Sequence, residues 1–378
     1  MSLKLPIYLD YNATTPVDTR VLEEMLPYFT HKFGNAASKT HSFGWTAEDA
    51  VKTARQQIAK LLNCLEQEII FTSGSTEAIN LAIKGVYEAY HSKGNHIITV
   101  ETEHKAVLDT CKSLEKKGAQ VTYLPVDKNG LINLEQLNNS ITDKTILVCI
   151  MYANNETGVI QPIKEISKIV HAKNSILFSD ATQAIGKINV DIQKDGIDLL
   201  CMSAHKIYGP KGVGALYIRR KYPRVTLISQ MHGGGHERGL RSGTLNVPGI
   251  VGLGKSLSPT LSQGEGENLA MLRDLLEKEL CKLPNAKING KNAPRLPNTS
   301  NILFKGVKAD SLITKLKDIA FAAGSACTSA NPQPSHVLKA MGLSDADAFS
   351  SVRFSLGKYT TMEEIEFVIK KITENISL

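Results

Sequence analysis

The chain has 378 residues, and its 44 Lys and Arg against 37 Asp and Glu give a formal net charge of +7. This length predicts one large domain and a smaller one. The basic excess is spread over mixed-sign segments without a basic block or interleaved aromatic residues, which argues against a nucleic-acid-binding protein, and no apolar run is long enough to cross a bilayer.

Strand-like and helix-like patterns alternate from about residue 44 onward. Amphipathic helices are expected at 45–62, 76–90, 107–116 and 134–138, and short apolar strands at 69–72, 96–100, 120–124 and 146–152. Further apolar runs lead to Asp180 and to Met202. This alternation predicts an α/β fold with a mainly parallel sheet covered by helices on both faces, with ligands at the carboxyl ends of the strands. After Gly252 the composition becomes rich in Ser and Gly, and a charged helix is expected at 268–282.

Two polar residues follow neighbouring strand-like runs and suggest a shared ligand. Lys206 lies between the run 196–202 and a Gly/Pro turn, and a lysine whose pKa is lowered by burial and nearby cations can hold a carbonyl compound as a Schiff base. Asp180 ends the run before it, where a carboxylate can pair with a protonated pyridine nitrogen, and Gln183 lies within reach of a ring hydroxyl. Asp180 alone could equally cap the following helix.

A Ser/Thr-rich turn between the strand 69–72 and the next helix predicts an anion site. Gly74 allows a tight turn, and Ser75 and Thr76 open the helix, whose N-terminal N–H groups favour a phosphate. Ser203 and His205, just before Lys206, are expected to complete this phosphate cup. Ser and Thr are also common helix caps, so the turn carries weight only together with the other motifs.

These motifs, taken in order, resemble the pyridoxal-phosphate enzymes of the aspartate-aminotransferase fold type, and within them the cysteine desulfurases of the iron–sulfur assembly type. The resemblance extends over nearly the whole chain. The segments that carry it are 8–16, 71–77, 103–105, 154–156, 203–206, 324–329 and 353–357.

The resemblance implies the architecture in more detail. It implies PLP-dependent transferase fold type I, with a mainly parallel seven-stranded sheet flanked by helices and a smaller α+β domain. We expect a large cofactor-binding domain at 16–258, and a small domain formed by 1–15 together with 259–378. The Gly-rich stretch from His232 to Thr244 would reach the phosphate of the neighbouring subunit, which implies a homodimer in which Thr244 binds cofactor.

The resemblance also assigns roles to individual residues around pyridoxal 5'-phosphate. His104 would stack on the ring and carry a proton, and Asn155 would contact both the ring and the substrate carboxylate. Arg353 would hold that carboxylate through a bidentate pair. Cys327, in a loop of small residues, would be the nucleophilic thiol, and the one metal role considered is transient ligation of a cluster by Cys327.

The resulting hypothesis is a cysteine desulfurase that converts L-cysteine to L-alanine and leaves a persulfide on Cys327. A sulfur-acceptor protein, such as an iron–sulfur scaffold, would collect the sulfur for cluster assembly or for tRNA thiolation. Selenocysteine lyase and class V aminotransferase activities on the same scaffold, and a non-catalytic assembly subunit, stay open as alternatives. A hydrolase built on Cys327 and His336 would leave Asp180 and Lys206 unexplained.

The six cysteines and the N-terminal residues bear on the compartment. No Cys-x-x-Cys or His-spaced pair occurs, which argues against structural zinc, and free thiols suggest a reducing environment. Residues 1–10 lack the features of a signal or transit peptide, so we expect a soluble cytoplasmic protein. The segment 249–256 has the spelling of a P-loop but follows 246–248, where a strand should be, so ATP binding is not expected there.

Overall fold

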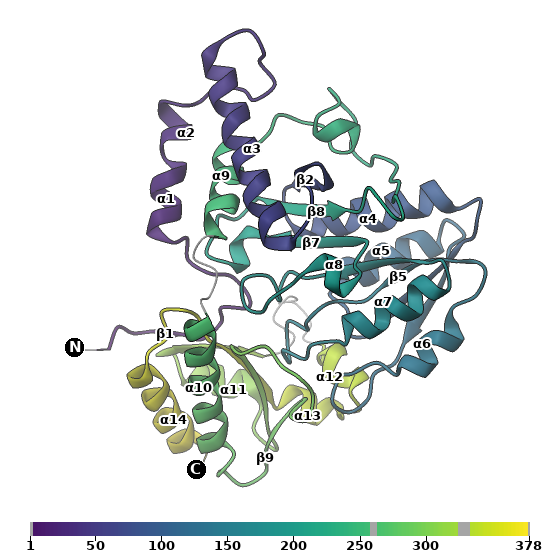
Figure 1. Cartoon of the computed structure of the whole chain (residues 1–378). Coiled ribbons are helices and arrows are strands. Elements are labelled where there is room, and N and C mark those ends of the chain that lie inside the picture. Colours follow the sequence, from purple (N-terminus) through teal and green to yellow (C-terminus); the bar gives the residue numbers. More distant parts are fainter. Residues whose placement is uncertain (1–2, 258–262, 324–332, 377–378) are drawn as a thin grey trace.

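The computed structural model describes residues 3–257, 263–323 and 333–376, and these residues form a larger and a smaller sheet with helices packed around them (Figure 1). The larger sheet has seven strands in the order β2-β8-β7-β6-β5-β3-β4. Their bounds are β2 Ile69–Thr72, β3 His96–Val100, β4 Gln120–Leu124, β5 Thr145–Cys149, β6 Ile176–Asp180, β7 Leu199–Ser203 and β8 Gly214–Ile218.

Six of these seven strands run in the same direction. The pairs β3·β4, β3·β5, β5·β6 and β6·β7 are parallel, and β8 alone is antiparallel to both of its neighbours, β2 and β7. The carboxyl ends of the six strands therefore meet at one edge of the sheet. The predicted α/β fold with a mainly parallel seven-stranded sheet is confirmed.

Helices cover both faces of the larger sheet, which explains why its strands are almost continuously apolar. In β7, Leu199 and Cys201 face one core, whereas Leu200 and Met202 face the other. The first core is completed by α4 (Ser75–Tyr90) and α5 (Lys105–Glu115). The second is completed by α3 Ser42–Leu62, α6 Leu134–Ser140, α7 Ile163–Ala172, α8 Ile192–Asp195 and α9 Val247–Ser256. Two further helices, α1 (Thr19–Met25) and α2 (Pro27–Thr30), contact α9.

The smaller sheet is antiparallel and belongs mostly to the C-terminal part of the chain. Its order is β12-β13-β10-β9, from Ala322–Ala323, Ser351–Ser355, Thr299–Phe304 and Ala286–Ile288. Around it lie α10 Gln263–Leu280, α11 Ala309–Lys315, α12 His336–Ala340, α13 Asp345–Phe349 and α14 Met362–Ile376. Near the N-terminus, β1 (Ile7–Tyr8) pairs in parallel with β11 (Ile319–Ala320), and Ile7 and Leu9 join the core of this C-terminal part. The domain limits given above stay a prediction.

Several predicted helix boundaries differ from the structure because capping residues lie outside the apolar pattern. The helix expected from residue 45 begins at Ser42, because the His41 side chain accepts the Gly44 N–H. The helix expected from residue 107 begins at Lys105, since His104 caps it, and the helix expected at 268–282 is Gln263–Leu280. The strand expected from residue 196 begins only at Leu199, because Gly196 has φ +70° and ends α8.

Two other sequence expectations are resolved by the fold. The segment that imitates a P-loop lies inside α9, so no strand precedes it, as predicted. The strand expected at 146–152 is regular only over Thr145–Cys149, but Ile150 and Tyr152 continue to donate backbone hydrogen bonds to β6, at 3.0 and 2.9 Å.

The N-terminal strand should contribute strongly to stability in spite of its two-residue length. Ile7 is fully buried among α10, α14 and the smaller sheet, so Ile7→Ala should lower the free energy of unfolding by about 2–5 kcal/mol. The measurement is urea unfolding followed by circular dichroism. Leu5→Ala is the matched control, because Leu5 is 47% exposed. An equal, small effect of both substitutions would contradict this account of the N-terminal strand.

Candidate active site

Most of the predicted site residues come from five strand ends that meet at one edge of the larger sheet. Ser75 and Thr76 open α4 after β2, His104 follows β3, and Asn155 follows β5. Asp180 is the last residue of β6, with Gln183 in the turn after it, and Ser203 is the last residue of β7. His205 and Lys206 lie in the 3₁₀ turn Ala204–Lys206. The shared strand direction brings these side chains to one region although they are far apart in sequence.

Asp180 is buried and is tied to the start of α4. Its Oδ1 accepts the Thr182 N–H at 2.9 Å and the Cys201 thiol at 3.3 Å, and Thr182 Oγ1 lies 2.6 Å from Ser75 Oγ. Asp180 does not cap a helix, because the residues after it form turns and not an α-helix. Its hydrogen bond from the Thr182 N–H lies within the first of these turns. The carboxylate is therefore held in place at the strand end by its own turn and by the neighbouring strand.

Cys201 is a neighbour of Asp180 that sequence reasoning missed. It is fully buried, and burial, with a further contribution from Asp180, raises the pKa of its thiol well above the ordinary value. The thiol is thus protonated and acts as a hydrogen-bond donor to the carboxylate. Only the register of β6 and β7, which pairs Asp180 with Cys201, reveals this contact.

The N-terminus of α4 forms an open cradle of backbone donors. Gly74 occupies the N-cap with φ +152° and supplies no capping side chain, and the first N–H groups of a helix have no intrahelical acceptor. A Cβ added at Gly74 would lie 3.7 Å from Ser203 Oγ, so the two segments are close. A Cβ at Gly214 would lie only 2.7 Å from Gly74 Cα, so glycine at 214 lets β8 pack against the cradle. A phosphate group fits this donor set.

His205 is held beside this cradle as a neutral ring. Its Nδ1 lies 3.1 Å from Thr14 Oγ1. Burial, reinforced by the charges of Lys206 and Lys211, lowers its pKa to about 4. At neutral pH, His205 therefore adds no charge to the site, and its contribution is hydrogen bonding.

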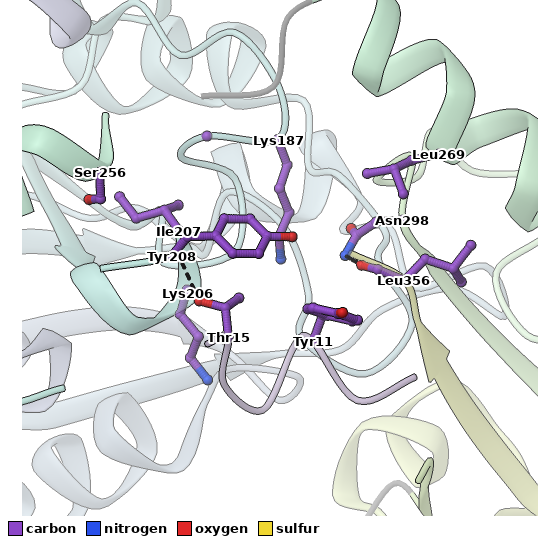
Figure 2. A pocket seen from close by; sticks show the side chains of 11 residues that line it. Tyr11, Thr15, Lys187, Lys206, Ile207, Tyr208, Ser256, Leu269, Asn298 and Leu356 are labelled. Carbon is purple, nitrogen blue, oxygen red and sulfur yellow. Dashed lines mark hydrogen bonds between the residues drawn. The ribbon is translucent and has the colours of Figure 1, made fainter. Parts of the chain in front are cut away.

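Lys206 is held by the N-terminal segment, which the sequence did not connect with it. Its Nζ donates to the backbone carbonyls of Asn12 and Ala13, both at 2.7 Å. Thr15 also bonds the same turn, because its N–H and its hydroxyl both donate to the His205 carbonyl, at 2.9 and 3.1 Å. Residues 12–15 thus run along the lysine turn, and Lys206 borders a pocket that Thr15 and Tyr11 also line (Figure 2).

His104 caps α5 with one ring nitrogen and leaves the other available. Its Nδ1 accepts the Ala106 N–H at 3.1 Å, so in the neutral ring the proton resides on Nε2. The side chain is exposed. This orientation suits the proton-carrying role expected for His104.

Asn155 and Arg353 are brought together from the larger and the smaller sheet. Arg353 Nη1 donates to the Asn155 carbonyl at 3.1 Å, and Nη2 pairs with Asp10 Oδ1 at 2.5 Å. Arg353 Nε is buried without a hydrogen-bond partner among the described residues. The Asn155 side-chain amide likewise has no hydrogen bond to any described residue, since the hydrogen bonds of Asn155 involve its backbone carbonyl. The guanidinium is therefore positioned to bind an anion, and Asp10 is a competitor that sequence reasoning missed.

Thr244 lies apart from the other predicted site residues that the structure describes. Thr244 is exposed, and no hydrogen bond connects it with the other site residues in the described ranges. Its segment is nevertheless anchored, since Arg241 pairs with Glu77 of α4 at 2.7 Å and Glu237 accepts two hydrogen bonds from Arg55. Cys327 lies outside the described residues.

The described residues contain neither a metal-binding cluster nor a membrane-spanning helix. Among residues 3–257, 263–323 and 333–376, no group of three or more His, Cys, Asp or Glu side chains could hold a metal ion. In the same ranges, no helix is both long and apolar enough to span a bilayer.

Comparisons with known proteins identify the family. The family model described as aminotransferase class-V matches residues 7–368. Cysteine desulfurase IscS of Anaeromyxobacter sp. (strain Fw109-5) is 52% identical over 377 residues, which cover 99% of this chain and 93% of that protein. A solved NifS-like protein is 41% identical, with a TM-score of 0.91 over 99% of this chain and 100% of its own. The structure titled SspA in complex with cysteine is 38% identical, with a TM-score of 0.84 over 94% of this chain and 100% of its own.

The chain therefore belongs to the class-V aminotransferase family, a family of pyridoxal-phosphate-dependent enzymes. Within that family it is a cysteine desulfurase, since its full-length relatives at about half identity are cysteine desulfurases. The family and the enzyme class predicted from the sequence are confirmed.

The carboxyl group beside Asn155 gives a test of the site's electrostatics. Glu156 is buried and accepts a hydrogen bond from the Ser335 hydroxyl at 2.5 Å. Burial raises the pKa of Glu156 to about 7, although this hydrogen bond and the charges of Arg353 and Lys105 act in the opposite direction. The folded protein therefore holds this proton more tightly than the unfolded chain does.

We expect Glu156→Gln to gain stability relative to wild type as the pH rises. A carboxyl whose pKa is raised by folding stabilises the protein at low pH and loses that contribution between pH 4.5 and about 7. The difference in free energy of unfolding should change by roughly 2–4 kcal/mol in favour of the variant from about pH 4.5 to about pH 8. Urea unfolding across that range measures it. Glu165→Gln, at an exposed position of α7, is the control, and parallel pH profiles of wild type and Glu156→Gln would refute the assignment.

Proposed function

We propose that the strand-end site holds pyridoxal 5'-phosphate through the residues predicted for it. The observation that carries the proposal is the convergence of a lysine amine, a buried carboxylate and a bare helix N-terminus at one sheet edge. The donors at Ser75, Thr76 and Ser203 suit the phosphate, and Asp180 suits the ring nitrogen. His205, neutral at physiological pH, adds a hydrogen bond, and Gln183 suits the ring hydroxyl.

In this proposal the chain's own residues move the protons. When bound, the cofactor withdraws electrons from the bonds of an attached amino acid. Lys206 would hold the cofactor through its amine, and the free amine would transfer protons at the substrate Cα. His104 donates or accepts a proton through Nε2, which its capping hydrogen bond leaves available. Cys201 and the Thr182 N–H keep the Asp180 carboxylate oriented.

L-cysteine is the proposed substrate, and Arg353 and Asn155 bind its carboxylate. The substrate carboxylate takes the place of Asp10 at the guanidinium, and the buried Arg353 Nε gains the partner that it lacks. Cys327 thiolate then attacks the substrate sulfur. An S–S bond forms, the C–S bond breaks, its electron pair stays on carbon, and protonation gives L-alanine. The sulfur remains on Cys327 as a persulfide.

We also propose a homodimer and an acceptor for the persulfide sulfur. The anchored segment from His232 to Thr244 would place Thr244 at the phosphate of the second subunit, which agrees with its exposure and with the absence of a hydrogen bond from Thr244 to the other described site residues. The acceptor in this proposal is a protein such as an iron–sulfur scaffold, and the proposal is supported only by the similarity to relatives named cysteine desulfurase IscS. The cysteines of the described residues, Cys64, Cys111, Cys149, Cys201 and Cys281, are all free, which suits a reducing compartment such as the cytoplasm.

Alanine release from L-cysteine in the presence of a thiol reductant tests the role of Cys327. Wild type should release alanine and sulfide in equal amounts, whereas Cys327→Ala should retain the cofactor but lose the persulfide and nearly all turnover. Cys281→Ala, which removes another free thiol, should behave like wild type. Equal alanine from wild type and Cys327→Ala would remove Cys327 from the chemistry, and none from either protein would contradict the desulfurase function.

Replacement of the lysine tests the cofactor assignment. Lys206→Ala should lower alanine release by at least about 10²–10⁴-fold, the range that positioned proton transfer contributes, and it should abolish covalent attachment of the cofactor. Borohydride reduction followed by peptide mass mapping detects that attachment. Lys60→Ala, at an exposed position of α3, is the control. Unchanged turnover in Lys206→Ala would disprove the assignment.

A further inference from the structure

Lys187 is a buried amine that the mechanism above does not use. It lies in the turn after β6, four residues after Gln183. Its Nζ donates to Gln183 Oε1 at 2.5 Å and to Asn12 Oδ1 at 3.0 Å. Part of its aliphatic stem borders the pocket that Lys206 also lines (Figure 2). The side chain thus joins a proposed cofactor ligand to the N-terminal segment.

The electrostatic setting of Lys187 is unusual. Part of the residue keeps contact with solvent, but its amine is enclosed, and burial lowers its pKa well below the ordinary value. The charges of Lys206 and Arg353 act in the same direction. Among the described residues, no carboxylate lies within salt-bridge distance of Lys187, although Asp10 pairs with the nearby Arg353. A lysine kept in such surroundings makes hydrogen bonds that an apolar side chain could not replace.

Asn12, the second partner of Lys187, contacts three residues of the site. It is 1% exposed. Its carbonyl accepts hydrogen bonds from Lys206 Nζ at 2.7 Å and from Gln183 Nε2 at 3.0 Å. Its side-chain amide donates to the Asn155 carbonyl at 3.2 Å. A shift of Asn12 would therefore move several site residues at once.

Lys187 also fixes which end of the Gln183 amide faces the site. An ammonium or amine N–H donates, so the atom that faces Lys187 is the amide oxygen. Gln183 Nε2 is then the end that points to the Asn12 carbonyl. Without Lys187, Gln183 Oε1 loses its donor, and the amide is held only through the hydrogen bond from Nε2 to the Asn12 carbonyl.

We propose that Lys187 is a positioning residue for the desulfurase reaction, which holds Asn12 and Gln183 so that the Lys206 amine and the Gln183 amide keep their places. The proposal rests on the proposed function of Lys206 and Gln183. Lys187 acts through these residues and touches no reacting atom. Asn12 has other anchors for the fold itself, because Asn298, Thr299 and Ser355 bond it independently of Lys187. Loss of Lys187 should therefore affect the reaction more than folding.

The test compares Lys187→Met and Lys168→Met, the latter at an exposed position of α7, as holoenzymes. In Lys187→Met, kcat for alanine release should fall by about tenfold to a hundredfold, the cost of misplacing a reacting group, while KM changes by less than about threefold. The pH midpoint of the bound cofactor's absorbance should also shift, because an amine that influences Lys206 has been removed, whereas the neighbouring His205, Lys211, Arg353 and Asp10 are unchanged. Lys168→Met should match wild type in all three measurements.

A second variant keeps the proposal testable if Lys187→Met folds poorly. Asn12→Ala retains the backbone carbonyl but removes the side-chain oxygen that Lys187 binds, together with the side-chain bonds to Asn155, Asn298 and Thr299. Its kcat should therefore fall at least as far as that of Lys187→Met, with a spectral shift in the same direction. The double variant should be within about threefold of Asn12→Ala alone, because Asn12→Ala already removes the hydrogen bond between Lys187 and Asn12.

Three outcomes would overturn the proposal. One is a Lys187→Met enzyme with wild-type kcat and absorbance midpoint. Another is additive losses in the double variant. The third is a Lys187→Met protein that unfolds while Asn12→Ala behaves like wild type. A wild-type protein that binds no cofactor would instead refute the proposed function, so the two failures can be told apart.

Discussion

The shared direction of six strands in the larger sheet is the constraint on which the site depends. It brings the ends of β2, β3, β5, β6 and β7 to a single edge, and each of these ends supplies at least one polar side chain. The strands are buried on both faces, so their own side chains are committed to the two cores. Polar chemistry is left to the last residue of a strand, as with Asp180 and Ser203, and to the residues just beyond each strand.

A second feature on which the site depends is how its positively charged side chains are stabilised. Lys187, Lys206 and Arg353 lie close enough to influence one another, and the described surroundings supply few carboxylates. Backbone and amide oxygens take the place of anions, with Asn12 binding two of the three cations through its carbonyl and its side chain. Such a site is prepared for an anionic ligand, because a bound phosphate or carboxylate relieves repulsion that is already present. The net positive charge of the chain is consistent with a site that binds an anionic ligand.

The sequence predicted those site residues that directly follow a strand, because strand and helix patterns are local. Asp180 and Lys206 fall into this class, and so does the turn before α4. Asn12, Lys187 and Cys201 could not be found in this way. Their importance arises from contacts between distant segments, such as the hydrogen bonds of Asn12 to residues 155, 183 and 206. The register that places the Cys201 thiol beside Asp180 is likewise a tertiary property.

The pairing of β1 with β11 has a consequence for synthesis of the chain. Ile7 leaves the ribosome long before its partner Ile319, which is made only after the whole larger sheet. Until then, the apolar N-terminal strand has no sheet to join, and the segment that carries Asn12 has no anchor on its N-terminal side. A nascent chain can therefore complete its larger sheet with Lys206 in place and still lack the carbonyl that holds the amine. Activity should appear only after β11 has been made and has paired with β1.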